Sequence, residues 1–172
     1  AEDYSLIVKV SSLLINKSLK SLLAFRMIQL IVEKNIDVPE IYETMTYFCK
    51  VVAMIEGQEQ TTSAIKALSH FIVSYEMTHN KRIVYIRNLL KVAAEFETNA
   101  GRRVVLACLQ QVYRNLDPET LSGCVDISVV SFVVTIANCS QLSDGSEQVI
   151  SDAMQTLAVF LKRCEETGYQ RC

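Results

Sequence analysis

The sequence predicts an all-α fold, and three observations lead to this class. Half of the 172 residues are hydrophobic, and only 5 Gly and 2 Pro interrupt them. Apolar residues recur at intervals of three and four through most of the chain, which is the period of one face of an α-helix. Runs that alternate polar and apolar residues are absent from the sequence, so we predict no β-sheet.

The periodicity predicts eight helices that follow one another as antiparallel pairs and that are joined by short polar segments. The expected helices cover about residues 2–15, 18–34, 39–56, 60–77, 81–97, 100–116, 119–139 and 146–166. They form four units, at about 2–34, 39–77, 81–116 and 119–166. A chain of 172 residues suits one domain, and we expect a single helical-repeat domain over residues 1–172.

Helix starts and stops are marked by a few residues. Pro39 and Pro118 each stand where a helix is expected to begin, and proline loses nothing at the first helical position because the N–H there has no partner. The Asp117 side chain can accept a hydrogen bond from a free N–H of the helix that follows. Asn80 and Asn99 mark two further boundaries in the same way.

Every second helix repeats one apolar pattern. A small residue or valine is followed four residues later by a large aliphatic residue, and three residues after that by an aliphatic or aromatic one. The four sets are Ala24, Ile28 and Ile31; Ala64, Leu68 and Phe71; Val105, Leu109 and Val112; and Ala153, Leu157 and Phe160. Such a stripe packs closely against a neighbouring helix, and helix pairs repeating at about 40 residues are typical of helical-repeat proteins.

In this register and in the length of its helix pairs, the whole chain resembles the HEAT and armadillo-like superfamily of α-solenoids. The resemblance implies a right-handed superhelix that acts as a non-catalytic scaffold for protein–protein interaction. The period does not choose between HEAT and armadillo units. A plain eight-helix bundle or a VHS-like superhelix would give a similar period, so these alternatives stay open at the level of sequence.

The sequence predicts no enzyme, because no catalytic, cofactor-binding or metal-binding residue emerges from it. His70 lies on an apolar segment, AIKALSHFIV, at a position expected on the flank of a helix. Cys49 could approach it from the preceding helix, but Cys49 belongs to the apolar pattern and is a poor candidate for a nucleophile. His79 is expected to be a solvated residue at a helix end. Closely spaced cysteine or histidine pairs for zinc and glycine-rich loops for phosphate are both missing.

The candidate site is a surface. In HEAT-like folds the second helix of each pair lines the inner face, and here that face is mildly basic, with Lys20, Arg102 and Gln155 among its polar residues. The predicted partner-binding residues are Arg26, Lys66, His70, Arg103, Gln110, Gln111, Arg114 and Lys162. A row of cations suits an acidic or amphipathic protein segment. The alternatives are a nucleic-acid-binding helical repeat and a solvated face without a ligand.

The net charge and the positions of the cysteines limit the kinds of partner and the cellular compartment that we expect. The net charge is −2, so the strong positive field of a general DNA binder is missing. The most apolar stretch, residues 129–139, is about half the length needed to span a bilayer, and we expect no membrane contact. Cys49, Cys108 and Cys139 lie within apolar helical pattern, and no signal segment is visible. We therefore expect an intracellular protein, cytoplasmic or nuclear, and a chain that is a fragment or processed form of a longer one.

Overall fold

The computed structural model describes residues 2–140 and 146–168, and every regular element in these residues is helical. This confirms the all-α prediction. The described residues form nine α-helices and one short 3₁₀ helix. Their bounds are α1 Glu2–Lys17, α2 Leu22–Glu33, α3 Glu40–Val51, η1 Val52–Met54, α4 Gln58–Ser74, α5 His79–Glu95, α6 Asn99–Asn115, α7 Pro118–Gly123, α8 Val125–Ser140 and α9 Ser146–Glu166. None of these helices has the length and apolar character required to cross a membrane.

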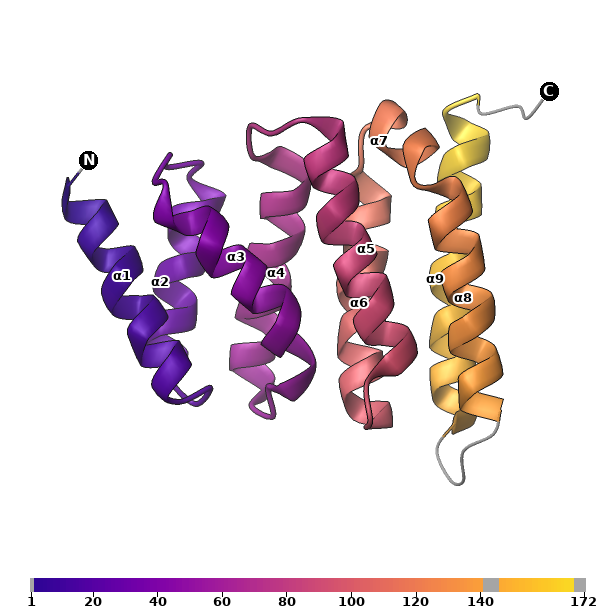
Figure 1. The fold of residues 1–172 in the computed structure, drawn as a ribbon, viewed down its shortest axis with the longest axis horizontal. Helices are drawn as coiled ribbons and strands as arrows, with labels where there is room; N and C mark the ends of the chain where they lie inside the picture. Colours follow the sequence, from indigo (N-terminus) through magenta and orange to yellow (C-terminus); the bar gives the residue numbers. More distant parts are fainter. Residues whose placement is uncertain (1, 141–145, 169–172) are drawn as a thin grey trace.

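The helices form two layers, and within each layer they stand side by side along the molecule (Figure 1). In one layer α1 packs against α3, α3 against α5, and α5 against α8. In the other layer α2 packs against α4, α4 against α6, and α6 against α9. Because each helix of one layer is followed in sequence by a helix of the other, residues about 40 apart become neighbours.

The core lies between the layers and follows the predicted apolar register. Of the twelve residues in the four predicted sets, eleven are buried, and Leu157 is half-buried. Aromatic rings fill the wider parts of this core. The Phe71 ring lies 5.2 Å from that of Tyr85 and 4.9 Å from that of Tyr75, and the Tyr113 ring lies 4.8 Å from that of Phe160.

One prediction was wrong, because a segment expected to form a single helix forms two. The segment expected as one helix over 119–139 is divided at Cys124 into α7 and α8. The Cys124 N–H is bound by the carbonyls of Thr120 and Leu121, and its thiol donates to the Leu121 carbonyl at 3.3 Å. These bonds complete a turn after α7. Gly123, which favours helix ends, is the only local sequence signal for the break.

The predicted starts at the two prolines are confirmed. Pro118 is the first residue of α7, and the Asp117 carboxylate accepts from the Thr120 N–H at 2.9 Å. Pro39 immediately precedes α3. The structure also shows how α2 ends: Asn35 has a φ of 49°, a left-handed conformation that asparagine accepts more readily than most residues.

Side chains of one unit donate hydrogen bonds to backbone carbonyls of the unit before it. The Tyr75 hydroxyl donates to the Ile36 carbonyl at 2.7 Å, and Gln60 Nε2 donates to the Lys20 carbonyl at 3.0 Å. Asn138 Nδ2 likewise reaches the Ala94 carbonyl at 3.0 Å. Ala94 lies in the last turn of α5, where a carbonyl has no partner within the helix, whereas Lys20 and Ile36 lie in the connections before and after α2. All three bonds join neighbouring units.

Candidate partner-binding groove

A groove of about 790 Å³ crosses the C-terminal halves of α4 and α6 and the end of α2. We call it the basic groove. It is lined by Glu33, Lys66, Ser69, His70, Val73, Ser74, Gln111, Arg114 and Asn115. Four of the predicted partner-binding residues therefore meet here, from two helices: Lys66 and His70 on α4, and Gln111 and Arg114 on α6.

The two cations of the basic groove lack a carboxylate partner among the described residues. Lys66 is exposed and forms no ion pair there. The Arg114 guanidinium donates to Gln110 Oε1 at 3.1 Å, which is a neutral acceptor. Glu33 is the acidic residue on the lining, and its carboxylate accepts from Gln29 Nε2 at 2.8 Å. The groove thus presents positive charge that the surrounding described side chains leave uncompensated.

His70 is half-buried, and its Nε2 atom is buried without a hydrogen-bond partner among the described residues. The predicted flank position is confirmed, because the equivalent residues Leu30 and Gln111 are exposed. A buried polar atom without a partner costs free energy. Because this atom is shielded from solvent, a ligand in the groove would reach it only after the imidazole rotates.

Gln111 is held at the groove by a contact across the units. Ser69 Oγ lies 3.2 Å from Gln111 Oε1 and 3.2 Å from the Lys66 carbonyl oxygen, and its single proton serves one of them at a time. The Gln111 N–H groups are the part of that side chain that can donate to a ligand. The basic groove combines charged donors with neutral ones, which is the donor set that binds carboxylates.

A second groove of about 570 Å³ continues from the first between α2 and α4, and both include Lys66. We call it the polar groove. Arg26 lies in it, where its guanidinium forms an ion pair with Glu59 at 2.9 Å. Both side chains are well exposed, so the pair contributes little to stability. It does neutralise Arg26, which the sequence had placed among the free cations.

The other predicted site residues lie away from the basic groove. Arg103 Nε forms an ion pair with Asp152 Oδ2 at 2.7 Å, and Lys162 Nζ lies 3.9 Å from Glu166 Oε1. Gln110 takes part only as the acceptor for Arg114. The sequence shows the sign of each side chain but not the direction in which its helix turns it, so these pairings were not predicted.

Arg102 was expected on the exposed face, and this is wrong. The residue is 5% exposed, its Nε donates to the Phe96 carbonyl at 2.6 Å, and Nη1 lies 3.1 Å from Cys139 Sγ. Arg103 is one residue further on and is therefore turned about 100° round the helix. One of the two adjacent arginines closes the end of α5, and the other faces solvent.

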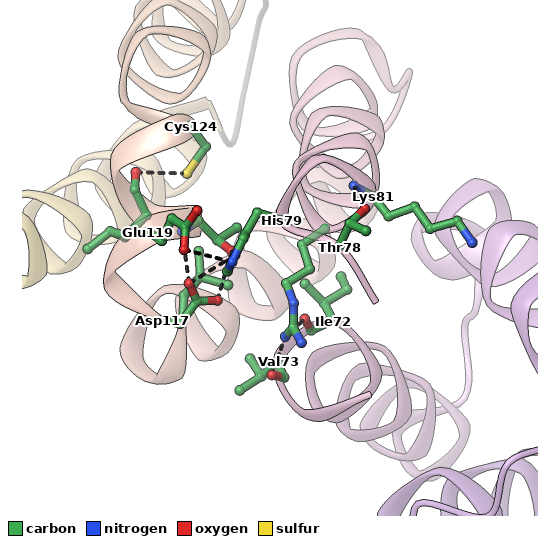
Figure 2. Close-up of polar contacts among 12 residues, drawn as sticks. Ile72, Val73, Thr78, His79, Lys81, Asp117, Glu119 and Cys124 are labelled. Atoms are coloured by element: carbon green, nitrogen blue, oxygen red, sulfur yellow. Dashed lines mark hydrogen bonds and ion pairs between the residues drawn. The ribbon is translucent and has the colours of Figure 1, made fainter. Parts of the chain in front are cut away.

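The expectation of a simply solvated His79 is also wrong. His79 is the first residue of α5, and its ring lies among side chains of α7 (Figure 2). Nδ1 lies 2.8 Å from Thr120 Oγ1 and 3.3 Å from Asp117 Oδ1, and Nε2 lies 2.8 Å from Glu119 Oε2. The separation of 41 residues between His79 and Thr120 equals the repeat period, so the period itself was the signal that could have found this cluster.

A hydroxyl, a histidine and a carboxylate in sequence suggest nucleophilic catalysis, but the hydrogen bonds have the wrong direction. Thr120 is fully buried, and its hydroxyl donates to Asp117 Oδ2 at 2.7 Å. Burial would raise the pKa of Asp117, but hydrogen bonds from Thr120 and the charges of His79 and Arg82 lower it overall. The carboxylate is therefore ionised and accepts the Thr120 proton, so His79 is the donor to Thr120. This cluster joins α5 to α7.

The buried thiols do not favour nucleophilic chemistry either. Burial raises the pKa of Cys49 far above its ordinary value, and it raises that of Cys108 to about 12. Both are therefore protonated thiols at neutral pH, and the thiolate is the nucleophile. In the part of the chain that the structure describes, no three His, Cys, Asp or Glu side chains are arranged to hold a metal ion.

Comparison of the chain with protein-family models, with curated proteins and with solved structures found no match.

Proposed function

We propose that this protein is a non-catalytic scaffold that binds an acidic or amphipathic segment of a partner protein in the basic groove. One observation carries the proposal. Lys66 and Arg114 line this groove without a carboxylate partner among the described residues, whereas Arg26 and Arg103 are each paired with one. In the layer of α2, α4, α6 and α9, this groove is the place where unpaired positive charge can bind a ligand.

As part of this proposal we infer that the architecture is an α-solenoid of the HEAT or armadillo type with a right-handed superhelix. The packing of each helix against the next of its own layer, and the burial of the apolar register, favour this reading. Solenoids bind extended partners, because equivalent positions of successive units form one continuous surface. The basic groove spans three successive units in this way, through α2, α4 and α6.

The groove chemistry favours a carboxylate-bearing ligand. Hydrogen bonds between charged groups contribute about 1.5 to 3 kcal/mol each when they are partly buried, and less at an exposed rim. Arg114 lies in the last turn of α6, where the helix dipole alone favours a cation. The ligand is favoured because Arg114 opens onto a groove that also holds the exposed Lys66.

An intracellular location is part of the same proposal. The cysteines Cys49, Cys108, Cys124, Cys139 and Cys164 are all buried and unpaired, which suits a reducing compartment.

The alternative is a nucleic-acid-binding helical repeat, since phosphates would also be attracted to Lys66 and Arg114. One feature favours the protein ligand. Neither lining, as described, includes a Phe, Tyr or Trp side chain on which a base could stack.

The test is calorimetric binding of a synthetic glutamate-rich peptide at moderate salt. Lys66→Glu combined with Arg114→Glu should weaken binding by about 1 to 3 kcal/mol. Arg103, which the sequence also favoured, is not used, because it is already paired with Asp152. The matched control is Lys50→Glu with Lys91→Glu, which makes the same change in net charge on exposed residues of the other layer.

Unchanged affinity in the first pair, or equal loss in the control, would reject the groove as the binding site. A single-stranded oligonucleotide serves as the second probe. Tighter binding of the oligonucleotide, with an affinity that falls steeply as salt increases, would favour the nucleic-acid alternative.

A further inference from the structure

A third groove lies at the other end of α4 and has a different character. It occupies about 800 Å³ between η1, the start of α4 and the start of α6. We call it the apolar groove, because its hydrophobic lining residues are Ala53, Met54, Ile55, Phe96, Ala100 and Val104. Polar residues of α4, among them Gln58, Thr61 and Thr62, form its edge.

The three grooves adjoin one another along α4, because neighbouring linings share residues of this helix. The apolar groove shares Gln58 and Thr62 with the polar groove, and the polar groove shares Lys66 with the basic groove. A ligand lying on the layer of α2, α4, α6 and α9 would therefore pass from one groove to the next without leaving the surface of α4.

The apolar groove keeps a large hydrophobic side chain in solvent. Met54 is 54% exposed, and methionine is a flexible side chain that adapts to irregular apolar partners. Gly101 forms part of the lining where the backbones come closest. A Cβ atom at Gly101 would lie 2.5 Å from the Ala53 carbonyl oxygen, so this position has no room for a side chain.

The charges of the two ends differ in sign. Glu56 is the charged residue on the lining of the apolar groove, whereas Lys66 and Arg114 lie on that of the basic groove. An acidic stretch is therefore attracted to the basic groove and repelled from the apolar one.

We propose that the partner segment is bipartite, with one or two apolar side chains in the apolar groove and an acidic stretch in the basic groove. This inference rests on the proposed function and adds the order and spacing of the ligand's chemistry. Thr61 and His70 lie near the middle of the two linings on α4, and nine residues of helix span about 13 Å. An extended chain covers that distance with about four residues.

The test uses three fluorescein-labelled synthetic peptides and fluorescence anisotropy. One carries four glutamates only, one adds a Leu-Phe pair across a four-residue Gly-Ser spacer, and one carries both blocks without the spacer. The spaced peptide should bind about tenfold or more tightly than the glutamate peptide, because burying one large apolar side chain supplies at least that factor. Removing the spacer should abolish the gain.

Met54→Asp should remove the gain from the Leu-Phe pair and leave the affinity for the glutamate peptide within about twofold. The matched control is Met154→Asp, which places the same change at an equally exposed methionine of α9 and should leave the gain intact. Val104→Ser serves as a second variant in the apolar groove. Circular dichroism of each variant shows whether it is folded.

The outcomes separate this inference from the proposed function. A Leu-Phe pair that adds nothing, while glutamate binding still depends on Lys66 and Arg114, would overturn the bipartite segment and leave the acidic ligand standing. If the affinity for the glutamate peptide is the same in the Lys66→Glu, Arg114→Glu variant as in the wild type, both the bipartite segment and the proposed function are overturned. Self-association of the protein that Met54→Asp abolishes would assign the apolar groove to a second copy of the chain and overturn the inference.

Discussion

At the scale of single residues, Asp117 does more than begin a short helix. Its carboxylate accepts from the Thr120 N–H and hydroxyl, and it lies 3.3 Å from His79 of the preceding unit. Asp117→Ala removes the cap of α7 and leaves Thr120 and His79 without this acceptor. We expect a loss of about 1 to 2 kcal/mol in the free energy of unfolding, measured by urea titration at neutral pH.

The matched control is Glu119→Gln, because Glu119 is 77% exposed and should matter little. The pKa of Asp117 is lowered from 3.8, so its contribution is present above that value and is lost as the pH falls below it. The difference between wild type and Asp117→Ala should therefore shrink on acidification. A difference that stays constant with pH would contradict this account of the cap.

Glu40 holds α1 on α3. Its carboxylate accepts from Ser5 Oγ at 2.7 Å and lies 2.9 Å from Lys9 Nζ. These hydrogen bonds, first that of Ser5 and then that of Lys9, lower the pKa of Glu40 from 4.5 to about 2. A lowered pKa means that the stabilisation is present above 4.5 and is lost as the pH falls towards 2.

We therefore expect α1 to exchange its amide hydrogens faster as the pH is lowered through this window, relative to α6, after correction for intrinsic exchange rates. In the Glu40→Gln variant, the amide hydrogens of α1 should already exchange fast at neutral pH, and their exchange rates should change little on acidification. Glu43→Gln, at an exposed neighbour on the same helix, is the control. Equal acid sensitivity of α1 in wild type and Glu40→Gln would contradict the role of this carboxylate.

At the scale of the helix, α4 combines the core and the groove within two residues. Leu68 is fully buried, whereas His70 is half-buried and faces the basic groove. Leu68→Ala should cost about 2 to 5 kcal/mol in a denaturant titration, because it removes buried apolar surface and leaves a cavity. His70→Ala should cost clearly less, since its ring nitrogen gains no hydrogen bond in the described core.

Leu109→Ala is the natural companion, because Leu109 occupies the equivalent position of α6 and is also fully buried. It should resemble Leu68→Ala. A loss in His70→Ala as large as that in Leu68→Ala would mean that the imidazole packs as part of the core.

At the scale of the whole molecule, contacts between units decide stability. Arg82 of α5 donates to the carbonyls of Ile72 and Tyr75 at 2.8 Å each and also to that of Val73, so it closes the end of α4 from the next unit. Arg82→Met keeps much of the side-chain volume and removes these bonds. We expect a loss of about 1 to 3 kcal/mol, because the carbonyls lose a charged donor in a partly buried setting.

The same coupling predicts that circular dichroism and tyrosine fluorescence report one shared unfolding transition in the wild type. Lys81→Met, at the neighbouring exposed position, is the control for Arg82→Met. Separate transitions for the two probes would show that the units unfold independently and would contradict the proposed coupling.

Much of this arrangement could be predicted from one number, the repeat of about 40 residues. The period identified the core positions, such as Leu68 and Leu109, because burial follows the apolar stripe. It also implied the neighbours of His79, since Thr120 lies 41 residues further on. Direction round the helix was the missing quantity. Without it Arg102 and Arg103 looked alike, although one is buried and the other is paired with Asp152.

The candidate site was predicted in part for the same reason. Lys66, His70, Gln111 and Arg114 meet because they occupy related positions on α4 and α6. The pairing of Arg26 with Glu59 depends on how two helix surfaces face each other, which the period alone does not specify. The break at Cys124 involves hydrogen bonds of its N–H and thiol within the turn after α7, which the period does not specify either.

Side chains that donate to backbone carbonyls of a distant segment mostly reach residues earlier in the sequence. Tyr75 reaches back to Ile36, Gln60 to Lys20 and Asn138 to Ala94, with Tyr42 reaching forward to Glu76 as an exception. Synthesis adds about 5 to 20 residues per second, so Tyr75 is made about 2 to 8 seconds after Ile36, which lies 39 residues earlier. During this interval the Ile36 carbonyl lacks the tyrosine donor. A nascent chain halted between these two residues would therefore expose the connection after α2 without the donor that the next half-unit supplies.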